Sequence, residues 1–467
     1  MESIKRRRFL KTGLAVSALG FGHFGILKAG PSPNSKVNVA SIGVGGMGGY
    51  DADSLAGADN VNLVGLCDVD EAWFKRHNGR RKNFQGMKLW KDYRVMFDKL
   101  GKDIDAIHTA TPDHVRFAVS MFAIRRDKHV YAQKPLCHTV SEVRTLTEEA
   151  RKHKVVTQMG HQGHSSEPAA MVRDWVQGGC IGDVREVHVF SWKNYGTKLK
   201  PATGNECPKT LDWNLFLNRA EEIPFSAAYI NREWIRYSHF AGIVGDMATH
   251  LFDPAYYALD LRVPVSVVAE VPEPVPPGWL PNAALITWEF AARDDMPPVT
   301  LKYYLGPDIP RPSLKHLERG RKIPFMERQS RLGGSVLVGE NASIMTEESW
   351  RPARIFPEVA MNATKKPPQV AYRRKAGSRS PAKNTETAIT DHLQNWIMAI
   401  QGEDKPMSDF DYVGPLSELI VLGDIAATHP GKKLLWDAEN MKITNNEEAN
   451  KSPFMRRLAP RDDMRWY

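Results

Sequence analysis

The feature that most constrains the fold is a short β-type run that leads directly into a glycine-rich turn. The run is Val37–Ile42, the turn reads Gly43-Val44-Gly45-Gly46-Met47-Gly48, and a helical pattern continues to Leu55. Glycines at these places permit a tight turn, a close approach of the backbone to a pyrophosphate, and packing of the helix on the strand. The N–H groups at the start of the helix then face the phosphates. The order of strand, turn and helix predicts a dinucleotide-binding unit.

An acidic residue stands at the expected distance beyond this turn. A second β-type run, Val61–Cys67, ends in Asp68, about twenty residues past the last glycine, where a carboxylate accepts hydrogen bonds from ribose hydroxyls. A carboxylate there also repels a 2′-phosphate, and no arginine directly follows it, so the sequence favours NAD over NADP. We assign these residues to cofactor binding: Gly43, Gly45, Met47, Gly48 and Asp68.

Further β-type runs alternate with helical stretches up to residue 160. The runs cover 105–109, 129–132 and 155–158, and the helical stretches cover 70–83, 113–126 and 141–153. This alternation predicts a doubly wound parallel sheet, in which ligands lie at the carboxyl ends of the strands. The residues expected there, around the nicotinamide, are Thr111, Pro112, His114, Gln133 and Lys134, with 159–162 one strand further on.

The pattern changes beyond residue 183. Longer alternating runs at 185–191, 264–270, 284–290 and 299–304 are followed by amphipathic helical patterns at 385–401 and 412–428. Such runs are typical of an antiparallel sheet packed by helices. The predicted fold class is therefore α/β, with an N-terminal Rossmann doubly wound parallel sheet and a C-terminal α+β domain that has a large antiparallel sheet. We place the NAD-binding domain at 36–160 and the substrate and oligomerisation domain at 161–467.

The first 30 residues resemble a twin-arginine signal peptide. The segment Lys5-Arg6-Arg7-Arg8-Phe9-Leu10-Lys11 precedes a weakly apolar stretch, 12–27, that is rich in Gly and Ala. The resemblance implies export to the periplasm by the twin-arginine machinery, which carries folded proteins, often with a cofactor already bound. A basic start on a cytoplasmic protein is the alternative.

The net charge of +9 does not indicate a nucleic-acid partner. Six basic residues against one acidic residue fall within the first 30 positions, and no basic stripe with interleaved aromatics follows. No apolar run approaches the roughly 18 residues that a membrane span needs. The four cysteines show neither a close pair nor the spacing of metal ligands, so no metal site is expected.

Several motifs taken together resemble the Gfo/Idh/MocA oxidoreductases, the family of glucose–fructose oxidoreductase and inositol dehydrogenase. The motifs are the glycine turn, Thr111-Pro112-Asp113-His114, Lys134-Pro135, and Gly245-Asp246-Met247-Ala248-Thr249-His250. The resemblance implies that Lys134, Asp246 and His250 form the catalytic group and that the chain is a homo-oligomer. This chain has Gln133 where the family usually has a glutamate, which removes a carboxylate from beside the lysine.

The same three residues suit the oxidation of a carbinol on chemical grounds. Asp246 and His250 are four residues apart, so on a helix they lie on one face. A neutral imidazole can accept the hydroxyl proton while hydride leaves carbon, which makes His250 the expected general base. Lys134 can stabilise the developing alkoxide, and Asp246 can orient the substrate or the histidine. The residues expected to contact a sugar are His161, Gln162, Trp213 and Trp234, the two tryptophans as ring platforms for C–H groups.

Export raises a question about how the cofactor turns over, because the periplasm has no obvious soluble NAD pool. Tightly held NAD leaves two enzymatic schemes. In one, a sugar reduces the bound cofactor and a second substrate reoxidises it. In the other, a redox-neutral lyase or glycosidase oxidises a ring carbon transiently, eliminates the glycosidic substituent and returns the hydride. NAD-dependent glycosidases that resemble this family carry Gly-Asn-x-Tyr-Pro-Thr-His-Gly where this chain has 245–251, so we place oxidoreductase first. A sugar-binding protein without catalysis is the third hypothesis.

Overall fold

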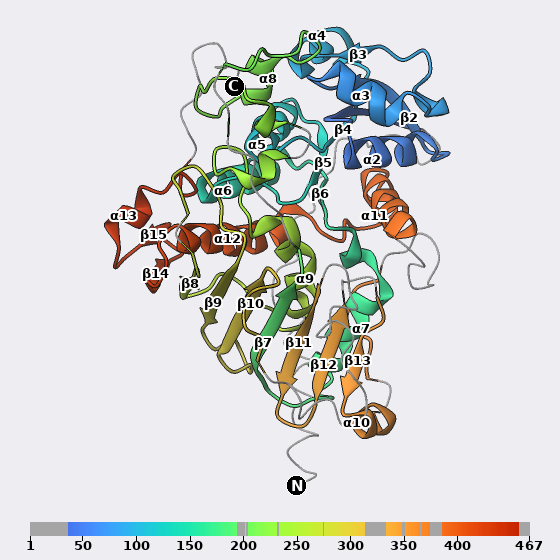
Figure 1. The fold of residues 1–467 in the computed structure, drawn as a ribbon. Helices are drawn as coiled ribbons and strands as arrows, with labels where there is room; N and C mark the ends of the chain where they lie inside the picture. Colours follow the sequence, from blue (N-terminus) through green and yellow to red (C-terminus); the bar gives the residue numbers. More distant parts are fainter. Residues whose placement is uncertain are drawn as a thin grey trace.

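The computed structural model describes residues 36–193, 201, 204–230, 233–273, 275–312, 333–347, 351–364, 367–373 and 385–456. The predicted signal peptide, residues 1–30, lies outside these ranges. Within them the chain forms two sheets. Figure 1 shows the first sheet with its helices in the upper part of the molecule and the second sheet below it.

The first sheet has six strands in the order β3-β2-β1-β4-β5-β6, and every pairing is parallel. Its strands are β1 (Val37–Ile42), β2 (Val61–Cys67), β3 (Leu89–Trp90), β4 (Ala106–Thr109), β5 (His129–Gln133) and β6 (Thr157–Gly160). The intervening helices are α2 (Met47–Ala56), α3 (Glu71–Asn78), η1 (Lys82–Phe84), α4 (Tyr93–Leu100), α5 (Asp113–Ile124) and α6 (Val140–His153). Because helices cover both faces, the central strands are buried and largely apolar. The predicted doubly wound sheet is confirmed.

The second sheet has nine strands in the order β13-β12-β11-β7-β10-β9-β8-β14-β15. They are β7 (Val184–Ser191), β8 (Ser266–Glu270), β9 (Ala284–Phe290), β10 (Val299–Leu305), β11 (Gly333–Gly339), β12 (Ser343–Glu347), β13 (Arg354–Phe356), β14 (Leu434–Asp437) and β15 (Lys442–Ile443). All pairs are antiparallel except β7 with β10, so the sheet is mixed. The prediction of an antiparallel sheet is therefore confirmed for every pair except this central one. β7 and β10 can run parallel because a long connection, which includes α9, β8 and β9, separates them in the sequence.

The helices and short 3-10 turns that follow β6 in the sequence lie between and beside the two sheets (Figure 1). They are η2 (Gln162–Ser165), α7 (Glu167–Gln177), α8 (Trp213–Leu217), η3 (Ala227–Tyr229), η4 (Glu233–Arg236), α9 (Gly245–Ala258), α10 (Glu358–Ala363), α11 (Thr385–Ile400), α12 (Phe410–Ala427) and α13 (Glu447–Asn450). In Figure 1, α12 lies between the two sheets, and it contacts α6 of the first domain as well as α9 and β8 of the second. No helix in the described ranges is both long and apolar enough to cross a membrane.

Helix α11 belongs in space to the first domain, although it follows the second sheet in sequence. Its Leu393 and Trp396 are buried with Val37, Val39 and Tyr131 on one face of the parallel sheet. Figure 1 shows α11 directly below α2. The predicted boundary at residue 161 therefore assigns this helix to the second domain by sequence order, whereas its apolar side covers the first sheet.

Candidate active site

A cavity of about 450 Å³ lies at the carboxyl ends of the parallel strands, where the second domain covers them. Its walls come from the β1–α2 turn, from the ends of β2, β4 and β5, from segment 211–218, from Ile230 and 233–236, and from α9. Most of the residues predicted from sequence line it: Gly43, Gly45, Met47, Gly48, Asp68, Thr111, Pro112, Gln133, Lys134, Gln162, Trp234, Asp246 and His250. Tertiary structure thus brings together residues as far apart in the sequence as Gly43 and His250.

Two glycines of the turn, Gly43 and Gly48, have no room for a side chain. Gly43 has a φ of +76°, and a Cβ there would lie 2.7 Å from the amide nitrogen of Thr111. A Cβ on Gly48 would lie 1.9 Å from the carbonyl oxygen of Gly43. Bare backbone therefore faces the cavity just where α2 begins, which is the arrangement that receives a pyrophosphate. The turn fits NAD, and Gly43, Gly45 and Gly48 are the residues that would hold its phosphates.

Asp68 fastens this turn and also lines the cavity. Its Oδ2 accepts hydrogen bonds from the backbone N–H groups of Val44 (2.9 Å) and Gly45 (3.0 Å). Its Oδ1 accepts one from the N–H of Asp70 at 3.0 Å. Burial raises the pKa of Asp68 from 3.8 to about 6, and the three backbone donors oppose that shift only in part. The side chain is therefore ionised at neutral pH and is placed to meet a ribose.

Lys134 and Asp246 meet at the floor of the cavity. The Lys134 ammonium donates to the backbone carbonyl of Asp246 at 2.6 Å and to its Oδ1 at 3.1 Å. A second ammonium, that of Lys193, lies 3.6 Å from Asp246 Oδ2. His250 lines the same cavity one helical turn further along α9. Burial and the nearby Lys134 charge lower the pKa of His250 to about 3, so its imidazole is neutral at neutral pH.

The buried carboxylate of Asp51 explains why a glutamine, Gln133, stands beside Lys134. The Gln133 amide donates to Asp51 Oδ2 at 2.6 Å, and the same oxygen is 3.0 Å from His108 Nε2. Asp51 and His108 are both fully buried. A glutamate at 133 would set a second carboxylate against Asp51, so the amide is the residue that suits this environment.

Three predicted residues lie elsewhere. His114 is buried with Nε2 2.8 Å from the carbonyl of Phe216 and Nδ1 3.3 Å from that of Phe240, so it joins α5 to the second domain and does not line the cavity. Trp213 packs in an aromatic cluster and donates its indole N–H to the carbonyl of Ile223 at 2.9 Å. His161 faces Asp253. In each case a neighbouring acceptor within the fold holds the side chain.

Trp73 and Lys193 are among the cavity residues that the sequence reasoning missed. Trp73 lines the cavity beside Gly45, where a Cβ would lie 2.1 Å from the indole. It is the third residue of α3 and so belongs to the same strand–helix connection as Asp68. Lys193 follows the end of β7 much as Lys134 follows β5. The signal available in both cases was a large or charged residue just beyond a strand end.

Helix α9 is held at its start by a carboxyl from α12. Asp424 Oδ1 accepts a hydrogen bond from the N–H of Val244 at 3.0 Å, and burial raises the pKa of Asp424 from 3.8 to about 8. The side chain is therefore protonated in the fold at neutral pH. In the unfolded chain Asp424 is ionised at neutral pH. Its contribution to the free energy of unfolding is therefore fully present below about pH 4 and is lost as the pH rises to about 8.

We expect Asp424→Asn to remove this dependence while keeping the acceptor for Val244. The difference in free energy of unfolding, variant minus parent, should therefore become more positive as the pH rises, by up to about 1.4 kcal/mol per pH unit. Urea unfolding at about pH 5 and about pH 8 measures it. Asp437→Asn is the control, because hydrogen bonds from Asn440 lower the pKa of Asp437 and keep it ionised in the fold at both pH values. A stability difference that does not change with pH would contradict the assignment.

A parallel sheet with a glycine turn on its first strand, covered at its carboxyl edge by a second domain, defines a two-domain dinucleotide-binding protein. Residues 37–161 match the family model described as "Oxidoreductase family, NAD-binding Rossmann fold", and residues 169–278 match the companion model, "Oxidoreductase family, C-terminal alpha/beta domain". The two matches together span half of the chain. The chain belongs to the Gfo/Idh/MocA oxidoreductase family, and its first domain is an NAD-binding Rossmann domain.

Individual relatives are more distant. Glycosyl hydrolase family 109 protein 1 of Akkermansia muciniphila is 25% identical over an alignment of 229 residues, with coverage of 39% of this chain and 47% of the relative. Levoglucosan dehydrogenase of Pseudarthrobacter phenanthrenivorans is 23% identical over 194 residues, 42% of this chain and 40% of the relative. The chain thus aligns with less than half the length of these curated relatives. An inositol dehydrogenase homolog from Azotobacter vinelandii, solved with NAD+, shares the fold, with a TM-score of 0.58, 15% identity, and coverage of 86% of this chain and 98% of that one.

Proposed function

We propose that this chain is an NAD-dependent oxidoreductase that acts on a carbinol of a sugar, glycoside or cyclitol and holds its cofactor tightly. The observation that carries the proposal is the meeting of Lys134 and Asp246 beside His250, in a cavity that also contains the glycine turn and Asp68. A cation, a carboxylate and a neutral imidazole are thereby gathered at the end of the sheet where the cofactor domain binds its ligand.

Each of the three side chains has a definable task. NAD, when bound at the glycine turn, supplies the hydride acceptor. The Lys134 ammonium, held by Asp246, donates to the substrate oxygen and stabilises the charge that develops on it. The neutral His250 accepts the hydroxyl proton. Its low pKa keeps it unprotonated but weakens it as an acceptor, and the carboxylates of Asp246 and Asp253 offset part of that shift.

The substrate class and the location rest on separate support. Relatives named for levoglucosan and inositol suggest a sugar or cyclitol, and Gln162 and Trp234 at the cavity offer an amide and a ring face for such a ligand. The twin-arginine segment at Lys5–Lys11 supports export to the periplasm with NAD already bound. We further propose that the mature protein is a homo-oligomer.

The test is a mass measurement of the purified mature protein under native and denaturing conditions, followed by a panel of sugars and glycosides monitored at the nicotinamide absorbance. We expect retained NAD(H) in the native protein, a mature N-terminus downstream of the signal, and reduction of the bound cofactor by at least one carbinol. Absence of retained cofactor together with turnover on added free NAD would contradict tight binding.

A redox-neutral glycosidase is the second candidate, and one observation favours it. Two of the curated relatives are named glycosyl hydrolase family 109 proteins, at 25% and 27% identity. Net chemistry separates the two functions. A keto-sugar accumulating from a glycoside indicates dehydrogenation, whereas free sugar without net change of the cofactor indicates hydrolysis.

The proposed contact of Asp68 with the cofactor predicts how NAD affinity varies with pH. Because the pKa of Asp68 is about 6, its carboxylate is ionised above that pH and protonated below it. NAD binding to cofactor-stripped protein should therefore be constant above about pH 7 and weaken by up to about tenfold per unit below about pH 6. Calorimetry measures this dependence.

Asp68→Asn should bind NAD more weakly and show no such dependence. Burial also raises the pKa of Asp113, near Lys134, to about 6, and this residue is unchanged in the variant. If Asp68→Asn kept the dependence of the parent protein, the titrating group would be Asp113 and the assignment of Asp68 would be wrong.

A further inference from the structure

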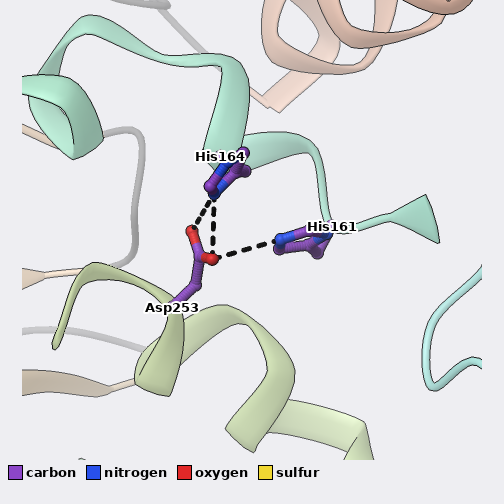
Figure 2. A group of neighbouring side chains, drawn as sticks. All are labelled: His161, His164 and Asp253. Carbon is purple, nitrogen blue, oxygen red and sulfur yellow. Dashed lines mark hydrogen bonds and ion pairs between the residues drawn. The ribbon is translucent and has the colours of Figure 1, made fainter. Parts of the chain in front are cut away.

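A second cluster of chemically active side chains lies outside the cavity. His161 and His164 stand on the turn that follows β6, and Asp253 stands on α9, one turn beyond His250. Figure 2 shows both imidazoles directed at the one carboxylate. The exposed fractions of the three residues are 1%, 2% and 0%, and none of them lines the cavity. We name this set the His–His–Asp cluster.

The distances within the cluster suit a shared metal ion. His161 Nε2 lies 3.2 Å from Asp253 Oδ1, and His164 Nδ1 lies 3.0 Å from both oxygens of that carboxylate. One donor atom from each of the three residues falls within 4.8 Å of the others. Ligands bound tetrahedrally to a metal at about 2.0–2.1 Å are separated by roughly 3.3 Å. Two imidazole nitrogens and a carboxylate oxygen form a donor set that Zn²⁺ and similar divalent ions accept.

Three groups converge on the Asp253 carboxylate. Its Oδ1 faces His161 and the Tyr412 hydroxyl, which donates to it at 2.7 Å, and His164 Nδ1 lies equally close to Oδ1 and Oδ2. A cation between the imidazoles and the carboxylate would account for their convergence and leave the Tyr412 hydroxyl as the outer hydrogen bond to the ligand, as is usual around metals.

Charge leads to the same inference. Asp253 is fully buried, and among the described residues its ion pairs go only to His161 and His164. A buried carboxylate requires a positive partner. A divalent cation supplies that charge.

We propose that His161, His164 and Asp253 bind one divalent transition-metal ion, of the Zn²⁺ class, as a structural site. The ion would fasten the end of β6 in the first domain to α9 in the second, and through Tyr412 to α12. Because α9 carries Asp246 and His250, the site would fix the position of that helix against the sheet. The site lies apart from the cavity, so its role is to hold the fold and not to contact substrate.

Metal analysis of the full chain tests this proposal independently of cofactor or turnover. The protein is stripped with a chelator, reloaded with Zn²⁺ or Co²⁺, and passed through gel filtration. We expect about one retained equivalent, visible d–d absorption with Co²⁺ of the kind given by low-symmetry nitrogen and oxygen coordination, and a Tm that falls on chelation and recovers on reloading. A parent protein that retains no metal and whose Tm ignores the chelator would overturn the proposal and leave a hydrogen-bonded triad.

Variants locate the metal. The amount of metal retained per chain should be at least tenfold lower in His164→Ala than in the parent protein. The Tm of this variant should also no longer fall when the chelator is added. The matched control is His108→Ala, which removes a buried histidine 3.0 Å from the Asp51 carboxylate where no third ligand is present among the described residues. Metal retained by folded His164→Ala, or lost equally in His108→Ala, would overturn the assignment. If His164→Ala fails to fold, the Co²⁺ spectrum of the parent chain still decides whether nitrogen ligands bind the ion.

Discussion

Replacing Lys134 with methionine is expected to lower kcat/KM on the carbinol substrate by about 10²–10⁴-fold. The ammonium of Lys134 lies at the cavity, 2.6 Å from the Asp246 carbonyl and 3.1 Å from its carboxylate, and it is the group placed to donate to the reacting oxygen. Methionine keeps most of the length and apolar volume of the side chain but cannot donate a hydrogen bond or carry charge. The fall should appear mainly in kcat, because the interaction is strongest when charge develops on the oxygen.

Two accompanying measurements separate this effect from a general loss of structure. The retained NAD and the Tm of Lys134→Met should stay close to those of the parent protein, because the glycine turn and Asp68 are untouched. Lys302→Met is the matched control, since Lys302 also forms a carboxylate ion pair, with Glu186 at 2.6 Å, but on β10 away from the cavity. A kcat/KM for Lys134→Met within tenfold of that of the parent protein would exclude the lysine from the chemistry.

Gly48→Ala is expected to abolish NAD retention and to lower the free energy of unfolding by about 3 kcal/mol or more. The added Cβ would lie 1.9 Å from the Gly43 carbonyl oxygen and 2.8 Å from the Ala110 Cβ. The Gly43 carbonyl oxygen belongs to the backbone of the turn that follows β1. The clash can therefore be relieved only if α2 moves away from the sheet. That movement would open the surface on which the pyrophosphate is expected to bind.

The control for this variant is on the same helix. A Cβ on Gly57, at the end of α2, meets nothing closer than 3.5 Å, so Gly57→Ala should change stability by no more than about 0.5 kcal/mol and leave the NAD content unchanged. Urea unfolding and the nucleotide released on denaturation measure both variants. Normal NAD retention in Gly48→Ala would show that the close packing of α2 on β1 is not required for binding the cofactor.

The glycine turn and Asp68 could be predicted from local sequence because each of these signals is short-range. The strand Val37–Ile42, the glycine turn and Asp68 lie within about thirty residues, and parallel strands joined by helices leave few ways to connect them. The spacing of Asp246 and His250 likewise fixed their common helix face, because four residues make about one turn. For these elements the chemistry of the residues and their order in the chain specify the arrangement.

The tertiary structure decided which of several chemically similar residues meet. His161 and His114 come after strand ends, as Lys134 does. His161 faces Asp253 of α9, whereas His114 faces the backbone carbonyls of Phe216 and Phe240. The parallel pairing of β7 with β10 and the packing of α11 on the first sheet are also long-range. The hydrophobic period of a helix or strand indicates which of its sides is buried. It does not indicate which other element that side packs against. The glycine turn and its carboxylate could therefore be read from the sequence, whereas the partners of Lys134 and the His–His–Asp cluster required the folded chain.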